Sequence, residues 1–298
     1  MGRLFHLPII PLFVFDGPHH PAIKCKKMVK KTPVWLTKDF KWLLEGFRFS
    51  YWEIQASSFH APGKAEAELA MLSCLGQIDM VMSEDFDTMI FGAQQVIRIK
   101  EESDSKYLIE VHDAGSRFSC NNLVMIALLA GGDYDVSQAV GCSIQTAADI
   151  MQSSVREQLF DALEAAEVDE YAAVASAWRQ NLCAMLEKQG AGRLHSQQCS
   201  LASCILLDFP KVPVLIQYIH PVTSQSNGAD NLPAAPSMHQ PDIPYLAKPC
   251  EELFIWGHLM GIIRSFHDHV FPGLATCELL QDLCMQQGLL QANDTHLS

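Results

Sequence analysis

Two short apolar runs, each followed at once by carboxylates, constrain the fold of this chain most. Residues 12–15 (LFVF) lead into Asp16, and residues 80–82 (MVM) lead into the acidic stretch 83–85 (SED). Runs of this kind are typical of strands buried on both faces. Further candidate strands alternate with candidate helices, the strands at 51–55, 96–100 and 107–111, the helices at 35–47, 65–75 and 121–130. The alternation predicts an α/β fold with a mostly parallel central sheet flanked by helices, with ligands at the carboxyl ends of the strands.

The second half of the chain has a helical pattern, so we expect the sheet to be complete before residue 136. The clearest helical stretches are 146–151, 155–166 and 171–189, and an apolar helix at 250–270 closes at Pro272-Gly273. Residues 221–244 contain five prolines and are interpreted as a loop or linker. We therefore predict four parts: a core at 1–135, a helical region at 136–220, a linker at 221–245 and a C-terminal helical region at 246–298.

Composition narrows the class of protein. A chain of 298 residues with 49% hydrophobic and 18% charged residues is typical of a globular protein with a sizeable core. No apolar stretch reaches the ~18 residues of a membrane span. Two prolines in the apolar start, followed by Asp16-Gly17, argue against a signal peptide. Ten cysteines without a C-x-x-C pair favour reduced thiols inside a cell.

The net charge of −13 argues against a general attraction to nucleic acid, but one segment of the chain is positively charged. Residues 22–41 carry seven lysines and a single acid: Lys24, Lys26, Lys27, Lys30, Lys31, Lys38, Lys41 and Asp39. A lysine run is often only a solvated helix face, and it can also serve as a nuclear import signal. In so acidic a protein, we favour contact with an anionic partner.

Five carboxylates are candidates for one site. Asp85 and Asp87 are two residues apart after an expected strand, which would put both side chains on one face about 7 Å apart. Asp16 and Asp133 also follow buried elements, and Glu66 lies in the first turn of its helix. Carboxylate oxygens suit Mg²⁺ or Mn²⁺, and a pair of such ions suits in-line attack on a phosphodiester.

Two other interpretations of these acids remain open. Each aspartate, taken alone, can be a helix cap or a turn residue. The segment DFDT at 85–88 is also similar to the D-x-D-x-T pattern of aspartyl-phosphate phosphatases. That fit is poor because Thr88 comes one residue early and polar residues precede Asp85.

Three segments within residues 8–135 together resemble a known family. They are PLFVFDGPHHPAIK, APGKAEAELAMLSCLGQIDMVMSEDFDTMIFGA and ALLAGGDYD. The chain resembles the flap-endonuclease/XPG superfamily of structure-specific nucleases, through its XPG-I region, and within it the Holliday-junction-resolvase branch as found in fungi. DFPKVPVLIQYIHP and PDIPYLAKPCEELFIWGHLMGIIRSFHDHVFPG are similar, more weakly, to the C-terminal part of fungal resolvase-like proteins.

The resemblance implies a PIN/5′-nuclease-like core followed by a helix-two-turn-helix-like module. It implies two Mg²⁺ or Mn²⁺ ions with ligands Asp16, Glu66, Asp85, Asp87 and Asp133. The lysine-rich segment would form a helical gateway for a DNA strand, with Lys24 and Lys31 neutralising charge at the scissile phosphate. The implied contacts to DNA are Lys24, Lys27, Lys30, Lys31, Gly141 and Ser143. It also implies a nuclear location, and no membrane partner.

The sequence departs from the family pattern at three places. The family's first strand and helix, with a further metal aspartate, have no counterpart before Met1, so we interpret the chain as N-terminally truncated. Lys64 stands where the family has the first glutamate of E-A-E. Ser143 replaces the second glycine of a G-x-G phosphate grip that keeps Gly141.

Lys64 is expected to weaken metal binding, since a unit charge pair at ~4 Å is worth on the order of 4 kcal/mol at an effective dielectric of ~20. Alternatively, Lys64 and Glu68 could form a surface pair four residues apart on the helix, worth about 0.3–0.5 kcal/mol. The leading hypothesis is a metal-dependent endonuclease acting on branched DNA, with activity that these departures could impair. The alternative is a silent or truncated member that binds DNA or a protein without cutting.

Overall fold

The structure is a computed structural model. It describes residues 1–16, 23–24, 27–28, 33–53, 64–103, 106–113, 119–132, 134, 142–188, 197–227, 232–254 and 258–286. The chain divides into two compact units. Unit 1 comprises Met1–Val14, Lys30–Trp52 and Pro233–Ser298, and unit 2 comprises Phe15–Val29 and Glu53–Leu232. The four-part division expected from the sequence, with boundaries after 135, 220 and 245, stays a prediction.

Unit 1 is built mainly of helices. Its elements are α1 (Gly2–Phe5), β1 (Leu12–Phe15), α2 (Val34–Phe47), β4 (Ser50–Glu53), α11 (Ile243–Leu253), α12 (Leu259–His269) and α13 (Phe271–Gln286), with the last residues of β1 and β4 assigned to unit 2. β1 pairs with β4. The core includes Phe47, Leu246 and Phe266, and α2 packs closely on α11 because a Cβ at Gly46 would come within 2.8 Å of the Leu246 side chain.

The prediction of one continuous helix over residues 250–270 is wrong in its extent. α11 ends at Leu253, where Phe254 has extended backbone, and α12 begins at Leu259. Pro272 does not close a helix, because it lies in the first turn of α13. Proline is tolerated there since its missing N–H would have no intrahelical partner.

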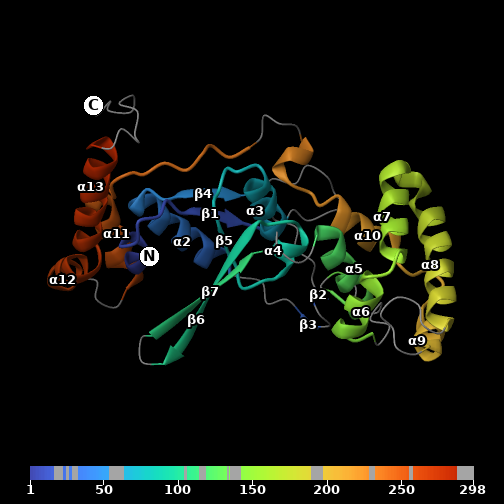
Figure 1. The fold of residues 1–298 in the computed structure, drawn as a ribbon. Helices are drawn as coiled ribbons and strands as arrows, with labels where there is room; N and C mark the ends of the chain where they lie inside the picture. The colour runs from blue at the N-terminus through green and yellow to red at the C-terminus, as the bar shows by residue number, and fades with distance from the viewer. Residues whose placement is uncertain are drawn as a thin grey trace. The chain divides into compact units, whose positions relative to one another are not determined.

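The first part of unit 2 contains short strands and two helices. Its elements are β2 (Ile23–Lys24), β3 (Lys27–Met28), α3 (Ala65–Cys74), β5 (Val81–Met82), α4 (Asp87–Ile90), β6 (Gln95–Ser103) and β7 (Lys106–Asp113). β5 pairs with β6 in parallel, with Val81 opposite Val96, and β6 pairs with β7 antiparallel. Figure 1 shows β6 and β7 as a long green ribbon. Val81 and Val96 form a small core with Ala70 of α3 and Ala93.

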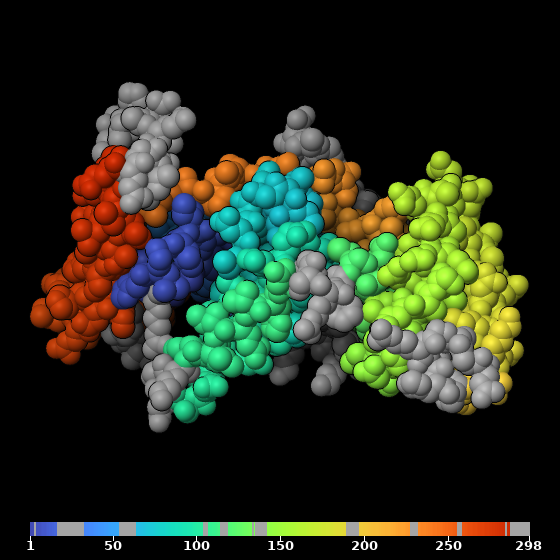
Figure 2. All heavy atoms as spheres, viewed as in Figure 1, coloured from blue at the N-terminus to red at the C-terminus, as the bar shows by residue number. Residues whose placement is uncertain are grey.

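The second part of unit 2 is helical. Its elements are α5 (Cys120–Ala130), α6 (Ile144–Met151), α7 (Val155–Ala165), η3 (Val168–Glu170), α8 (Tyr171–Glu187), α9 (Cys199–Cys204), α10 (Val212–Ile219) and η4 (Ser224–Asn227). Along α8, buried residues recur every three or four positions at Ala175, Trp178, Leu182 and Leu186, so one helix face enters the core. The Trp178 indole N–H donates to the carbonyl of Val155 in α7 at 2.7 Å. Figure 2 shows α7 and α8, in yellow-green, as a continuous block of side chains.

The α/β class with a helical part after it is confirmed. The mostly parallel central sheet that the sequence predicted is not seen among the described residues, whose strands are divided among three small sheets, β1-β4, β2-β3 and β5-β6-β7. β5 and β6 pair in parallel, whereas β2-β3 and β6-β7 are antiparallel. No helix in the described ranges is long and apolar enough to cross a membrane.

Candidate functional site

The first turn of α3 is held by a carboxylate from far along the chain. Lys64 is the residue before the helix, with extended backbone, and its side chain makes no capping bond. Asp16 supplies the cap instead, since its Oδ1 accepts from the Ala65 N–H at 2.8 Å. Asp16 and Glu66, two of the predicted ligands, are thereby brought to the same end of α3.

Asp85 lies in the turn between β5 and α4, and Asp87 is the residue at which α4 begins. The Asp85 N–H donates to Ser83 Oγ at 3.0 Å, and the Asp87 N–H donates to Asp85 Oδ1 at 3.0 Å. The strand arrangement expected for the two aspartates is wrong, because β5 ends at Met82 and Asp87 is the first residue of α4. Ser and Asp side chains that bind nearby backbone N–H groups favour turns over strands.

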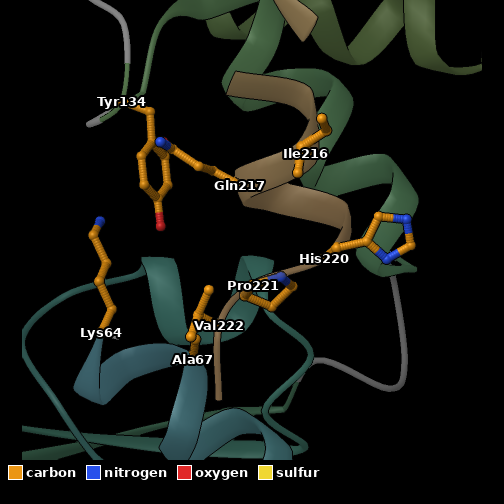
Figure 3. Close-up of a pocket in the computed structure, with 8 residues that line it drawn as sticks. All are labelled: Lys64, Ala67, Tyr134, Ile216, Gln217, His220, Pro221 and Val222. Atoms are coloured by element: carbon orange, nitrogen blue, oxygen red, sulfur yellow. The ribbon is translucent and has the colours of Figure 1, made fainter. Parts of the chain in front are cut away.

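Lys64 makes an ion pair with Asp87. Its Nζ lies 3.4 Å from Asp87 Oδ2, and only 11% of the Lys64 side chain and 10% of the Asp87 side chain are exposed. The same Nζ lies 3.9 Å from the ring centroid of Tyr134. Figure 3 shows Lys64, Tyr134 and Gln217 of α10 among the residues that line a cavity of about 90 Å³.

The alternative surface pair between Lys64 and Glu68 is wrong. Glu68 is fully buried and faces a different partner. Its carboxylate accepts from the Ser224 backbone N–H at 2.8 Å and also from the Ser224 hydroxyl. Lys64 is therefore free to point toward the Asp87 side of the site.

Each of the predicted acids Asp16, Asp85 and Asp87 acts electrostatically on Glu66 or on Tyr134. Burial raises the pKa of Glu66, and the charges of Asp16 and Asp85 raise it further, against the opposing effects of its backbone hydrogen bond and of Lys64. Burial also raises the pKa of Tyr134, with added contributions from Asp87, Tyr218, Glu66 and Asp85. We call Asp16, Glu66, Asp85 and Asp87 the carboxylate cluster.

Glu66→Gln is expected to change how stability depends on pH. The pKa of Glu66 in the folded protein lies above its ordinary value of 4.5, so the folded protein binds the carboxyl proton more tightly than the unfolded chain does. The free energy of unfolding contributed by Glu66 therefore falls as pH rises from about 4.5 through the folded pKa.

In metal-free buffer, the free energy of unfolding of Glu66→Gln relative to that of the wild type should increase as pH rises from about 4 to about 7.5. Urea denaturation at the two pH values measures the difference. A difference that stays constant, or that shrinks as pH rises, would contradict this assignment.

The described residues do not make a complete metal site. Among them, no three His, Cys, Asp or Glu side chains form a group that could hold one ion. Carboxylate oxygens are the correct donors for Mg²⁺, but Lys64 lies on Asp87. The fifth predicted ligand, Asp133, lies outside the described residues.

Most of the predicted DNA contacts also lie outside the described side chains. Lys30, Lys31 and Gly141 lie outside the described residues, and only the backbone of Lys24 and Lys27 is described. Ser143 is described as the N-cap of α6, where its Oγ accepts from the Thr146 N–H at 3.0 Å.

The expectation that the lysine-rich segment 22–41 is helical holds for residues 34–41, which lie in α2, and is wrong for residues 23–24 and 27–28. Residues 23–24 and 27–28 pair as antiparallel strands, with Lys24 opposite Lys27. In an antiparallel pair, the backbone hydrogen bonds join the two strands to each other. In a helix, they would run along the segment.

Tyr134 was not among the predicted site residues. It directly follows Asp133 in the AGGDYD segment, and this position was the signal that could have indicated it. Its ring is fixed by Tyr218 at 4.8 Å and Phe91 at 6.5 Å between centroids. The Glu68–Ser224 contact was also missed, and no sequence signal links those two positions.

Comparisons with known proteins match the stretch of chain that contains Glu66, Asp85 and Asp87. Residues 56–133 match the XPG I-region. The chain is 26% identical over 141 residues to Flap endonuclease 1 of Methanocaldococcus jannaschii, covering 46% of this chain and 41% of that protein. It is 32% identical over 108 residues to Flap endonuclease GEN-like 1 of Arabidopsis thaliana, covering 35% of this chain and 18% of that protein.

A solved structure agrees over a longer stretch. It is the Holliday junction-resolving enzyme GEN1 in complex with product DNA and a Mg²⁺ ion, with a TM-score of 0.67 and 27% identity over 92% of this chain. The chain spans 62% of that structure and less than half of either curated relative.

The matches define the class of protein. Residues 56–133 match the XPG I-region, as the sequence motifs predicted, and the chain is similar in fold to a Holliday junction-resolving enzyme. Within the flap-endonuclease/XPG superfamily, it resembles the GEN1-like junction-resolving enzymes.

Proposed function

We propose that this chain is a structure-specific DNA endonuclease of the XPG type, which hydrolyses a phosphodiester at a 5′ flap or four-way junction during DNA repair or recombination. One observation carries the proposal. The stretch that matches the XPG I-region, 56–133, contains Glu66, Asp85 and Asp87, three of the four acids of the carboxylate cluster.

The resemblance assigns the cofactor and the remaining roles. Two Mg²⁺ or Mn²⁺ ions are the expected cofactors, and the chemistry expected of them is activation of water and stabilisation of charge on the phosphate. Lys24 and Lys31 are proposed to neutralise the scissile phosphate, and Lys27, Lys30, Gly141 and Ser143 to contact the DNA backbone. A protein with this substrate is expected in the nucleus.

Cleavage of labelled junctions tests the proposal. The full chain is expected to cut 5′-flap or four-way junction DNA in Mg²⁺ or Mn²⁺, and Asp85→Asn is expected to lose that activity. Asparagine keeps the side-chain oxygen that accepts from the Asp87 N–H, so the turn is preserved while the charge is removed. Asp79→Asn, the same change at an exposed aspartate, is the control.

Equal cleavage by the wild type and Asp85→Asn would contradict the assignment of Asp85.

One specific observation favours a second function, in which the chain binds branched DNA or a protein without cutting. The Lys64–Asp87 ion pair puts a fixed positive charge at the cluster. Junction binding without cleavage in either metal would support that second function.

A further inference from the structure

The surroundings of Lys64 are those of a built-in cation and not of a surface lysine. The side chain leaves the chain at the residue before α3, where the backbone is extended, and ends 3.4 Å from Asp87 Oδ2. Both side chains are about nine-tenths buried. A lysine this far from water needs an opposite charge, and Asp87 provides one.

Tyr134 gives the ammonium a second contact. Its ring centroid lies 3.9 Å from Lys64 Nζ, within the range of a cation–π interaction. The ring packs edge-on against Tyr218 and against Phe91. The binding position of the ammonium is therefore formed by residues of the core that do not depend on a ligand.

This position conflicts with an ion at Asp87. Mg²⁺ binds carboxylate oxygens at about 2.1 Å. An ion on Asp87 Oδ2 would thus lie within about 5.5 Å of Lys64 Nζ, which is itself 3.4 Å from that oxygen. Two positive charges that close, in a part of the protein with little water, repel strongly.

We infer that the Lys64 ammonium takes the place of a divalent ion at Asp87. It keeps the Asp87 side of the carboxylate cluster neutral and ordered without metal, and it lowers the affinity of the cluster for divalent ions. The inference rests on the proposed function because it treats the cluster as the metal-binding end of the site. It assigns Lys64 as a residue that positions Asp87 and sets the charge of the site.

Titration with Mn²⁺ tests the inference by a readout that does not require cleavage. Free Mn²⁺ is followed by electron paramagnetic resonance in the 298-residue wild type, Lys64→Met and Lys64→Glu. Lys64→Met, which removes the charge at similar length, should bind Mn²⁺ at least about tenfold more tightly, and Lys64→Glu at least about a hundredfold. Lys100→Met, which breaks the exposed pair with Glu110, should bind as the wild type does.

Thermal denaturation gives a second measurement. Because Lys64→Met removes the ammonium that lies on Asp87, Mn²⁺ should raise the melting temperature of this variant more than that of the wild type. If Lys64→Met does not fold, Lys64→Gln replaces it, since glutamine can donate to Asp87 without carrying charge.

Two results would overturn the inference. One is a wild type that binds Mn²⁺ as tightly as the variants that lack the charge. The other is an absence of Mn²⁺ binding in every variant, which would also remove the metal-binding cluster from the proposed function. A protein that binds Mn²⁺ as expected but never cuts DNA would contradict only the proposed function.

Discussion

Asp87→Ala is expected to lower the free energy of unfolding by about 3–5 kcal/mol in metal-free buffer, because it removes the ion-pair partner of the buried Lys64 ammonium. The Lys64 side chain is only 11% exposed, so water cannot replace the lost carboxylate without local rearrangement. Urea denaturation followed by circular dichroism measures the loss.

The double variant Asp87→Ala/Lys64→Met should be more stable than Asp87→Ala alone. Removing both charges of a buried pair is often nearly neutral, whereas removing one leaves the other buried and unpaired. Glu110→Gln, which breaks the exposed pair with Lys100, should change stability little. If the double variant loses as much free energy of unfolding as Asp87→Ala and Lys64→Met lose in sum, the two side chains are not energetically coupled.

Glu68→Ala is expected to destabilise the protein by about 2–6 kcal/mol, from two buried donors left without an acceptor at about 1–3 kcal/mol each. Glu68 has no exposed surface, and its carboxylate accepts both the backbone N–H and the hydroxyl of Ser224. The contact fixes η4 against α3, so the residues 221–227 should also exchange amide hydrogens faster in the variant.

Ser224→Ala is the graded control for this prediction. It removes the hydroxyl but keeps the backbone N–H bond to Glu68, so its loss of stability should be clearly smaller. Denaturation gives the free energies, and hydrogen exchange with mass spectrometry reports on residues 221–227. Unchanged exchange there in Glu68→Ala would show that other contacts hold the segment.

The Glu68–Ser224 contact also corrects the view of residues 221–244 as a linker alone. The proline-rich composition predicted a loop, and residues 232–242 indeed have no helix or strand. The start of the stretch, however, forms η4 and is bonded to α3. Composition describes backbone preference, and it says nothing of a buried acceptor elsewhere in the chain.

Local pattern was sufficient for about half of the elements of the fold. The strand at Leu12–Phe15 and the helices at α2, α3 and α8 lie within two residues of where periodicity and apolar runs placed them. Such patterns report the neighbours of each residue along the chain, and secondary structure depends mainly on those neighbours. The single helix expected at 250–270 failed because the apolar pattern continued across the break after Leu253.

The site was predictable only in part, because sequence patterns report neighbours along the chain and not the contacts made in the fold. Motif resemblance selected Asp16, Glu66, Asp85 and Asp87, and the electrostatic effects on Glu66 and Tyr134 show that they lie near one another. The turn at 83–87 was not predicted, because side-chain bonds to backbone N–H groups competed with the strand pattern. The roles of Asp133, Lys24, Lys27, Lys30, Lys31 and Gly141 stay predictions.

By itself, the sequence determined the class of fold, the acids of the candidate site and the unusual lysine at the start of α3. Only the tertiary structure decided what that lysine does. Lys64 could have paired with Glu68 one helical turn away, but it binds Asp87, 23 positions along the chain, while Glu68 binds Ser224, 156 positions away. The choice of partner depends on which side chains the packing of α3, α4 and η4 buries together, and a local pattern does not contain that information.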